Sequence, residues 1–304
     1  MKYRTLGKTG LKVSVVGLGA WQFGGEWGKQ FSTKDADAII KVAGDNGINL
    51  IDTAECYGDH LSEELVGHAV EGNREKWIIA TKFGHKFHSH MNRTRHWSPD
   101  EIEQQLHESL KALHTDYIDI YQFHSALNEE FEQPALWERL WKFVESGKVR
   151  HIGMSINPAN EYQAQSSPKA RAEMLQILYN RLDRIAEEKT FPWAQKFNLG
   201  VLARVPLASG YLSGKYKPGD TFASNDVRSG HDIKAVEDKL RLVQQIKNEE
   251  VPQGVDMASW ALAWCLKHPA VTTVIPGCKS PEQVRSNAAA AAFATDDHPQ
   301  AINE

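Results

Sequence analysis

The chain has little cysteine, no long hydrophobic run and no excess of positive charge, and each absence excludes a class of protein. Three cysteines in 304 residues are too few and too odd a number for a disulfide framework, and they favour reduced thiols in a cytoplasm. No segment approaches the roughly 18 consecutive apolar residues of a membrane span, and the opening MKYRTLGKTGLKVS lacks the apolar core of a signal peptide. The net charge of −4, without basic runs, argues against nucleic acid or an anionic membrane as partner. These absences predict a cytoplasmic protein that binds neither nucleic acid nor a membrane.

Short apolar runs alternate with helical patterns along almost the whole chain. The candidate strands are residues 13–19, 48–52, 77–83, 117–123, 151–155, 175–178, 200–205 and 272–275. Eight strands alternating with helices predict an α/β fold whose parallel sheet closes into a (β/α)8 TIM barrel, as a single domain over residues 1–304. An open doubly wound sheet is the alternative. It is disfavoured because Trp21 and Phe23 stand where the helix after a glycine-rich phosphate turn should begin.

Local sequence signals predict where two of the helices begin and where a β-hairpin turns. Residues 98–113 carry Ser98 as N-cap, Pro99 at the first helical position and Glu101 for a capping box. A second helix is expected to start at Ser32 or Thr33 and to stop at Gly47. Residues 3–13 predict a β-hairpin that turns at residues 8–10 and covers the bottom of the barrel.

Four residues carry the chemistry that the sequence suggests. Asp52, Lys82 and His124 lie at the carboxyl ends of three consecutive predicted strands, where the active sites of barrels form. Tyr57 follows on the loop after Asp52. A buried lysine and a buried aspartate cost several kcal/mol each unless they pair. A phenol beside such a pair is expected to lose its proton more readily than a free phenol. Each residue alone has a structural explanation in packing or turns, but their joint placement favours a proton-donating site.

Several longer motifs then carry a family resemblance. In chain order they are IDTAECYG, ATKFG, SPDEIEQQLHESLKALHTDYIDIYQFH, IGMSIN, LARVPLASGYLSGKY and IPGCKSPEQVRSN. Together they resemble the aldo-keto reductases over residues 3–287. The resemblance implies a barrel that binds a nicotinamide dinucleotide without a Rossmann fold and reduces aldehydes or ketones. It also implies that Tyr57 is the general acid, that Lys82 paired with Asp52 lowers the pKa of the phenol, and that His124 orients the carbonyl.

The resemblance also implies a cofactor site. Its members are Ser155, Asn157, Gln176, Arg204, Leu207, Ser209, Gly210, Leu212, Gly214, Lys215, Gly277, Lys279, Gln283 and Asn287. Ser155 matches a serine that holds the carboxamide, whereas the usual Ser-Asn pair is interrupted before Asn157. Arg204 stands where many members stack a tyrosine on the nicotinamide, and its charge predicts a preference for the reduced cofactor; a solvent-facing arginine is the alternative. The loop over residues 207–232 is expected to wrap the pyrophosphate.

Cofactor choice depends on the last motif. Lys279 with Ser280 is the candidate for the 2′-phosphate, and Gln283 with Asn287 for the adenine. A family arginine is missing at the Gln283 position, and Arg285 is a possible substitute. NADPH is therefore preferred, with NADH possible.

The substrate side is predicted from aromatic residues. Trp21, Phe23 and Trp27 are expected to line a pocket for a small carbonyl compound, with core packing as the alternative. Histidines at positions 85, 88, 90 and 96 lack a carboxylate or thiolate framework in sequence, so no metal is predicted there.

Two other functions stay open: a cofactor-sensing subunit resembling potassium-channel beta subunits, and a sugar or polyol dehydrogenase. Neither the particular carbonyl compound nor the oligomeric state follows from the sequence.

Overall fold

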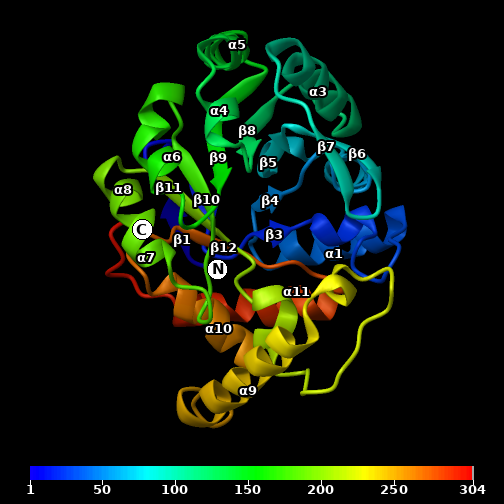
Figure 1. Ribbon diagram of the computed structural model, residues 1–304, viewed down its shortest axis with the longest axis vertical. Coiled ribbons are helices and arrows are strands. Elements are labelled where there is room, and N and C mark those ends of the chain that lie inside the picture. The colour runs from blue at the N-terminus through cyan, green and yellow to red at the C-terminus, as the bar shows by residue number, and fades with distance from the viewer. Residues whose placement is uncertain (303–304) are drawn as a thin grey trace.

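A parallel eight-stranded sheet lies at the centre of the computed structural model, which describes residues 1–302 (Figure 1). Its strands lie in the order β3, β4, β5, β8, β9, β10, β11 and β12, and every neighbouring pair is parallel. Parallel bridges from Val16 to Val274 and from Gly19 to Gly277 join the two outer strands and close the ring. The predicted (β/α)8 barrel is confirmed.

The strand and helix bounds are as follows. The barrel strands are β3 Leu18–Gly19, β4 Leu50–Asp52, β5 Ile78–Phe83, β8 Ile118–His124, β9 Val149–Ile156, β10 Met174–Leu178, β11 Gly200–Arg204 and β12 Thr273–Ile275. The α-helices are α1 Thr33–Asp45, α2 Leu61–Val70, α3 Pro99–Ala112, α4 Asn128–Phe131, α5 Pro134–Glu145, α6 Glu161–Ser166, α7 Ala186–Lys189, α8 Phe191–Lys196, α9 Ile233–Glu249, α10 Met257–Leu266 and α11 Pro281–Ala289. The 3-10 helices are η1 Trp21–Gly24, η2 Arg74–Lys76, η3 Ser167–Ala170, η4 Ala208–Ser213, η5 Val227–Gly230 and η6 Ala290–Phe293.

Both predicted helix starts are present. Ser32 caps α1 and Ser98 caps α3, and each forms a reciprocal capping box with the acidic residue three positions on, Asp35 or Glu101. The first helix ends at Asp45, just before Gly47, whose φ of 78° cannot continue a helix.

The N-terminal hairpin closes the bottom of the barrel, as predicted. Strands β1 (Tyr3–Thr5) and β2 (Lys12–Ser14) pair antiparallel. Leu6 and Val13 from this hairpin pack with barrel-interior residues such as Leu50 and Leu202. The first predicted strand, residues 13–19, is therefore two pieces, because Val13 and Ser14 pair within the hairpin and the barrel is joined from Val16 onward.

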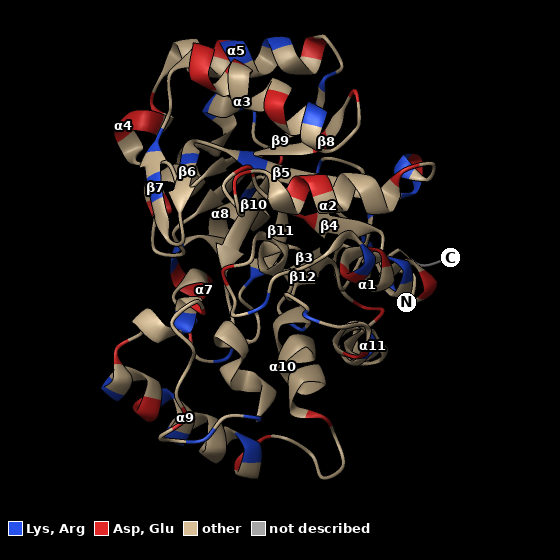
Figure 2. Ribbon diagram, turned by 90° about the vertical axis from the view of Figure 1, so that its right-hand side faces the viewer, with Lys and Arg blue, Asp and Glu red and all other residues tan. Residues whose placement is uncertain are grey.

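A second hairpin, formed by β6 (His85–Ser89) and β7 (Asn92–Arg95), lies on the side of the barrel away from the N-terminus (Figure 2). The sequence suggested only a polar loop here. The segment after β11 also crosses that end, because Val227 N donates to Glu26 O and Gly28 N donates to Asn225 O. Two loops thus meet over the carboxyl ends of the strands.

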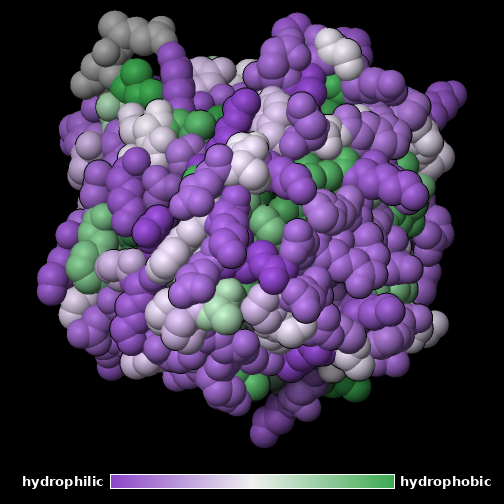
Figure 3. Space-filling model, turned by 90° about the horizontal axis from the view of Figure 1, so that it is seen from above, coloured by the Kyte–Doolittle hydropathy of each residue, from purple (hydrophilic) through white to green (hydrophobic). Residues whose placement is uncertain are grey.

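The surface is mixed in charge and mostly hydrophilic. Figure 2 shows acidic and basic residues interspersed along the outer helices, and Figure 3 shows hydrophobic residues in small separate areas on the face it presents. Among residues 1–302, no helix is both long and apolar enough to cross a bilayer.

Candidate active site

Asp52, Lys82 and Tyr57 form one buried hydrogen-bonded chain at the carboxyl ends of β4 and β5. Lys82 Nζ lies 2.7 Å from Asp52 Oδ1, 2.6 Å from Thr53 O and 3.3 Å from the Tyr57 hydroxyl. The side chains of Lys82 and Asp52 are 0% and 5% exposed. The ammonium therefore has its three donors satisfied by three oxygens, one of which is the candidate acid.

Two glutamines hold the other oxygen of Asp52. Gln176 Nε2 donates to Asp52 Oδ2 at 2.6 Å, and Gln122 Nε2 donates to the same oxygen at 3.1 Å. Ser155 Oγ continues the network to Gln176 Oε1 at 3.3 Å. Gln122 was not predicted, although the alternation of strand β8 places it on the same face as His124. The network fixes the carboxylate in one orientation.

The backbone of Tyr57 is positioned by a close contact between two glycines. A Cβ on Gly24 would lie 2.6 Å from Tyr57 C, and a Cβ on Gly58, whose φ is 70°, would lie 2.7 Å from Gly24 O. The ring of Tyr57 stacks on Trp21, with centroids 5.7 Å apart and planes 20° apart. Helix η1 and the β4–α2 loop are thus packed too tightly for any side chain between them.

Burial of the site favours a protonated phenol. Burial raises the pKa of Tyr57 to about 12, although the Lys82 charge and hydrogen bond oppose this. The expected lowering of this pKa is therefore corrected, because desolvation outweighs the nearby cation. Burial would lower the pKa of Lys82, but Asp52 and Tyr57 raise it above its ordinary value. Lys82 stays charged while Tyr57 keeps its proton.

His124 is held neutral. Burial and the charges of Lys82 and Arg204 keep its pKa well below the ordinary value for histidine. Its ring stands at 85° to the Tyr57 ring with centroids 6.0 Å apart. A neutral imidazole beside a protonated phenol offers two hydrogen-bonding groups to one substrate oxygen.

A cavity of about 670 Å³ opens above these residues. The predicted residues that line it are Trp21, Trp27, Asp52, Tyr57, His124, Ser155, Gln176, Arg204, Leu207, Ser209, Gly210, Lys215, Gly277, Lys279, Gln283 and Asn287. Lys82 lies beneath it, fully buried. One cavity therefore unites the predicted catalytic, cofactor and substrate residues.

Four predicted residues lie elsewhere. Phe23 belongs to the core, where it packs on Phe31 with centroids 5.2 Å apart. Leu212 is buried in a cluster beside α9 and α10, and Gly214 lies against Met257. Asn157 is exposed, because its side chain turns back to accept from Ala159 N at 2.9 Å.

Arg285 also lies outside the cavity lining. Its side chain is 57% exposed and pairs with Glu282 at 3.6 Å. It therefore does not take the place of the missing family arginine in this structure.

Further residues line the cavity and were not in the predicted set. They include Gln22, Cys56, His85, Arg93, Ser125, Tyr216, Arg228 and Glu282. Arg228 forms a buried ion pair with Asp226. Lys279 Nζ lies 3.6 Å from the same carboxylate and also donates a hydrogen bond to Trp27 O. These contacts tie the segment after β11 to the first βα loop. The signal in the sequence was only the unusual length of that segment.

The residues present fit a dinucleotide. Ala208, Ser209 and Gly210 have φ values of 48°, 59° and 91°, a run of left-handed backbone of the kind that turns successive N–H groups to an anion. Lys215 and the start of α11 add positive potential at the same cavity. Arg204 Nε is buried without a hydrogen-bond partner among the described residues, and this side chain lines the cavity. Backbone N–H groups, the Lys215 ammonium and the Arg204 guanidinium are donors that the phosphates and the carboxamide of a nicotinamide dinucleotide would use.

Fold and site together define a (β/α)8 barrel with a buried Asp–Lys–Tyr network beneath a cavity at the carboxyl ends of its strands. The Aldo/keto reductase family matches residues 15–302, and the chain belongs to this family of oxidoreductases acting on carbonyl and alcohol groups. The aldo-keto reductase YhdN of Bacillus subtilis (strain 168) is 33% identical over 300 residues, covering 94% of this chain and 87% of the relative. A probable voltage-gated potassium channel subunit beta of Oryza sativa subsp. japonica is 30% identical over 301 residues, covering 94% and 90%.

A solved structure shares the fold. The glycerol dehydrogenase AKR11B4 from Gluconobacter oxydans superposes with a TM-score of 0.83 at 28% identity, over 98% of this chain and 92% of that one. Family members use nicotinamide cofactors. The family and the site geometry agree on the class of reaction.

Proposed function

We propose that the protein is an NADPH-dependent reductase of small aldehydes or ketones in which Tyr57 is the general acid. The observation that carries this proposal is the chain from Asp52 through Lys82 to the Tyr57 hydroxyl, with links of 2.7 and 3.3 Å, at the floor of the cavity. When bound, the nicotinamide supplies the hydride. Tyr57 and His124 bind the carbonyl oxygen, and the phenol proton passes to that oxygen as negative charge develops on it.

The electrostatics of the site suit this step. Donors that are already placed in a dry pocket stabilise the developing charge of the oxygen more than they stabilise the ground state. Lys82 is charged and contacts the phenol oxygen, so it stabilises the phenolate that remains after proton transfer. Solvent then returns the proton to Tyr57. Asp52 and its two glutamines keep Lys82 in place.

Substitution of Tyr57 by phenylalanine tests the proposal. With NADPH and a panel of aldehydes and ketones, Tyr57→Phe should lower turnover by about 10²–10⁴-fold. Cofactor affinity, measured by fluorescence titration, should be unchanged. Tyr121→Phe is the matched control, because Tyr121 is fully buried outside the cavity and its hydroxyl has no hydrogen-bond partner among the described residues. Unchanged turnover in Tyr57→Phe would overturn the proposal.

The preference for NADPH is proposed on the position of Lys279 and Ser280 at the start of α11. Since Lys279 already contacts Asp226 and Trp27 O, it must exchange these contacts for a phosphate, so the preference is expected to be modest. Lys279→Gln should weaken NADPH binding by about tenfold, the value of one hydrogen bond to a charged group, and leave NADH binding nearly unchanged. Titration of both cofactors into both proteins measures this. Equal losses for the two cofactors would contradict the assignment of Lys279 to the 2′-phosphate.

Two relatives support other functions. The glycerol dehydrogenase suggests polyol oxidation, but the charge of Arg204 in the cavity disfavours the cationic oxidised nicotinamide. Tighter binding of NADP⁺ than of NADPH would favour the dehydrogenase. The potassium channel subunit suggests a cofactor sensor. Tight cofactor binding without turnover of any carbonyl compound, together with a stable protein partner, would favour the sensor.

A further inference from the structure

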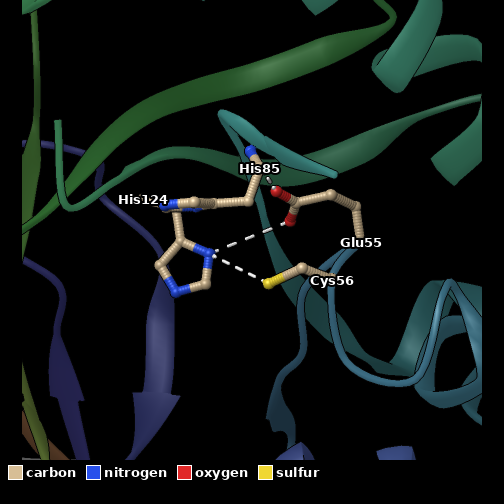
Figure 4. A group of neighbouring side chains, drawn as sticks. All are labelled: Glu55, Cys56, His85 and His124. Atoms are coloured by element: carbon tan, nitrogen blue, oxygen red, sulfur yellow. Dashed lines mark hydrogen bonds and ion pairs between the residues drawn. The ribbon is translucent and has the colours of Figure 1, made fainter. Parts of the chain in front are cut away.

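Four ligand-type side chains meet beside the active site, at positions that the proposed reaction uses only in part. Glu55 and Cys56 lie on the loop after β4, His85 begins β6 and His124 ends β8 (Figure 4). Each offers one ligand atom, and the four atoms lie within 4.8 Å of one another. Cys56 Sγ is 3.6 Å from His124 Nδ1, and Glu55 Oε2 is 3.9 Å from the same nitrogen.

Two atoms of this group are buried without a hydrogen-bond partner among the described residues. Glu55 Oε1 accepts from His85 N at 3.0 Å, but Glu55 Oε2 has no donor, although its side chain is only 2% exposed. His85 Nδ1 is unpartnered as well. An unsatisfied buried carboxylate oxygen is costly, and Figure 4 shows this one directed at His124.

We propose that Glu55, Cys56, His85 and His124 form a binding site for a divalent transition metal, with Zn²⁺ as the best match. Thiolate, imidazole and carboxylate are the ligands of zinc, at about 2.0–2.3 Å from the metal, which places neighbouring ligand atoms of a tetrahedron roughly 3.3–3.8 Å apart. The 3.6 and 3.9 Å separations at His124 Nδ1 are close to this spacing. The His85 and His124 rings stand at 88° with centroids 4.9 Å apart, so a small side-chain rotation brings the fourth ligand in.

The charges and protons balance. Binding replaces the thiol proton of Cys56, which leaves to solvent with any proton on Glu55. Thiolate and carboxylate then neutralise the two charges of the ion, as a buried site requires. No oxidant or reductant takes part.

The metal should inhibit the enzyme, and this consequence rests on the proposed function. Coordination by His124 draws its ring toward Glu55 and Cys56, and Cys56 directly precedes Tyr57. A bound ion at Nδ1 thus shifts the imidazole that is proposed to bind the carbonyl oxygen. Zinc should raise the KM for the carbonyl compound, and a chelator should restore it.

Metal binding itself is the first test and does not depend on activity. The metal-free full chain is titrated with Co²⁺, whose thiolate charge-transfer absorption reports Cys56 as a ligand, and with Zn²⁺ in competition. We expect a single ion per chain. Cys56→Ser should abolish the charge-transfer band, and Cys56→Ser and Glu55→Gln should each weaken binding at least about tenfold, the smallest loss typical even of outer-shell partners.

His88→Gln is the control, because His88 is exposed on the same strand as His85 and its ring bonds to Thr94 of its own hairpin. It should bind metal as the unaltered protein does. If one ligand variant fails to fold by circular dichroism, the other decides. Absence of binding, or binding that neither ligand variant weakens, overturns the site. Binding with the expected variant effects but without inhibition would keep the metal site and count against the role of His124 in the proposed function.

Discussion

At the scale of single residues, the Asp52–Lys82 pair couples stability to chemistry. Both side chains are buried, so removing one leaves the other charge without compensation. Lys82→Met should lower the free energy of unfolding by about 3–5 kcal/mol, the usual cost of an unpaired buried charge. Urea denaturation measures this.

The double variant Asp52→Asn with Lys82→Met is the control for that prediction. It removes both charges, so it should be more stable than the sum of the two single losses predicts. Simple additivity would show that the two charges do not interact strongly in the folded protein.

Individual site residues were predictable where strand periodicity fixed them. Asp52, Lys82 and His124 lie at the carboxyl ends of neighbouring barrel strands, and alternation alone aims them at one place. Glu55 could not be placed this way, because it follows the strand and its direction depends on the turn over residues 54–58. The direction of the pKa shift predicted for Tyr57 from sequence was also wrong. Burial outweighs the lysine charge, and the extent of burial is a property of the folded chain.

At the scale of one element, the start of helix α2 contains a titrating ion pair. His60 has a φ of 66°, and its Nδ1 lies 2.5 Å from Glu63 Oε2, whose side chain is fully buried. Burial disfavours the charge on His60, but the hydrogen bond and charge of Glu63 raise its pKa to about 9. A folded pKa above the unfolded value of about 6.5 stabilises the protein fully below pH 6.5, and this stabilisation is lost as the pH rises through 9.

His60→Asn should remove this pH dependence, because asparagine accepts the left-handed backbone but does not titrate. Between pH 6.5 and 9, the unaltered protein should lose roughly 1–3 kcal/mol of stability relative to the variant. Urea unfolding of both proteins at several pH values measures the difference. Parallel curves would show that His60 does not titrate in this range.

Elements were predictable to different degrees for a physical reason. The barrel strands are buried along almost their whole length because helices cover their outer face, so most of their residues are apolar and this pattern is strong. The hairpin β6–β7 was missed because its strands are polar and half exposed, and it is held by contacts far away in sequence. One such contact is the pair between Arg93 and Glu26, which no local pattern encodes.

At the scale of the whole molecule, the barrel has a packed hydrophobic cluster at one end and the candidate active site at the other. The hairpin β1–β2 packs into the amino-terminal end, whereas the candidate active site lies at the carboxyl ends of the strands. Arg4 reinforces this lower end, where its buried guanidinium donates to Leu266 O and Val271 O. Substitutions at the two ends should therefore have different consequences.

Leu6→Ala tests this separation. Leu6 is fully buried in the lower cluster, so its truncation should cost about 2–5 kcal/mol of unfolding free energy through lost burial and a cavity. The turnover of carbonyl compounds at 25 °C should be nearly unchanged as long as the protein is folded, because Leu6 does not line the cavity and shares with its lining only the cluster neighbour Ile275. Leu127→Ala is the control, since Leu127 is 48% exposed and should change stability little. A large loss of turnover with intact stability would mean that the lower end of the barrel transmits its packing to Tyr57, and the two ends would then have to be treated as one cooperative unit.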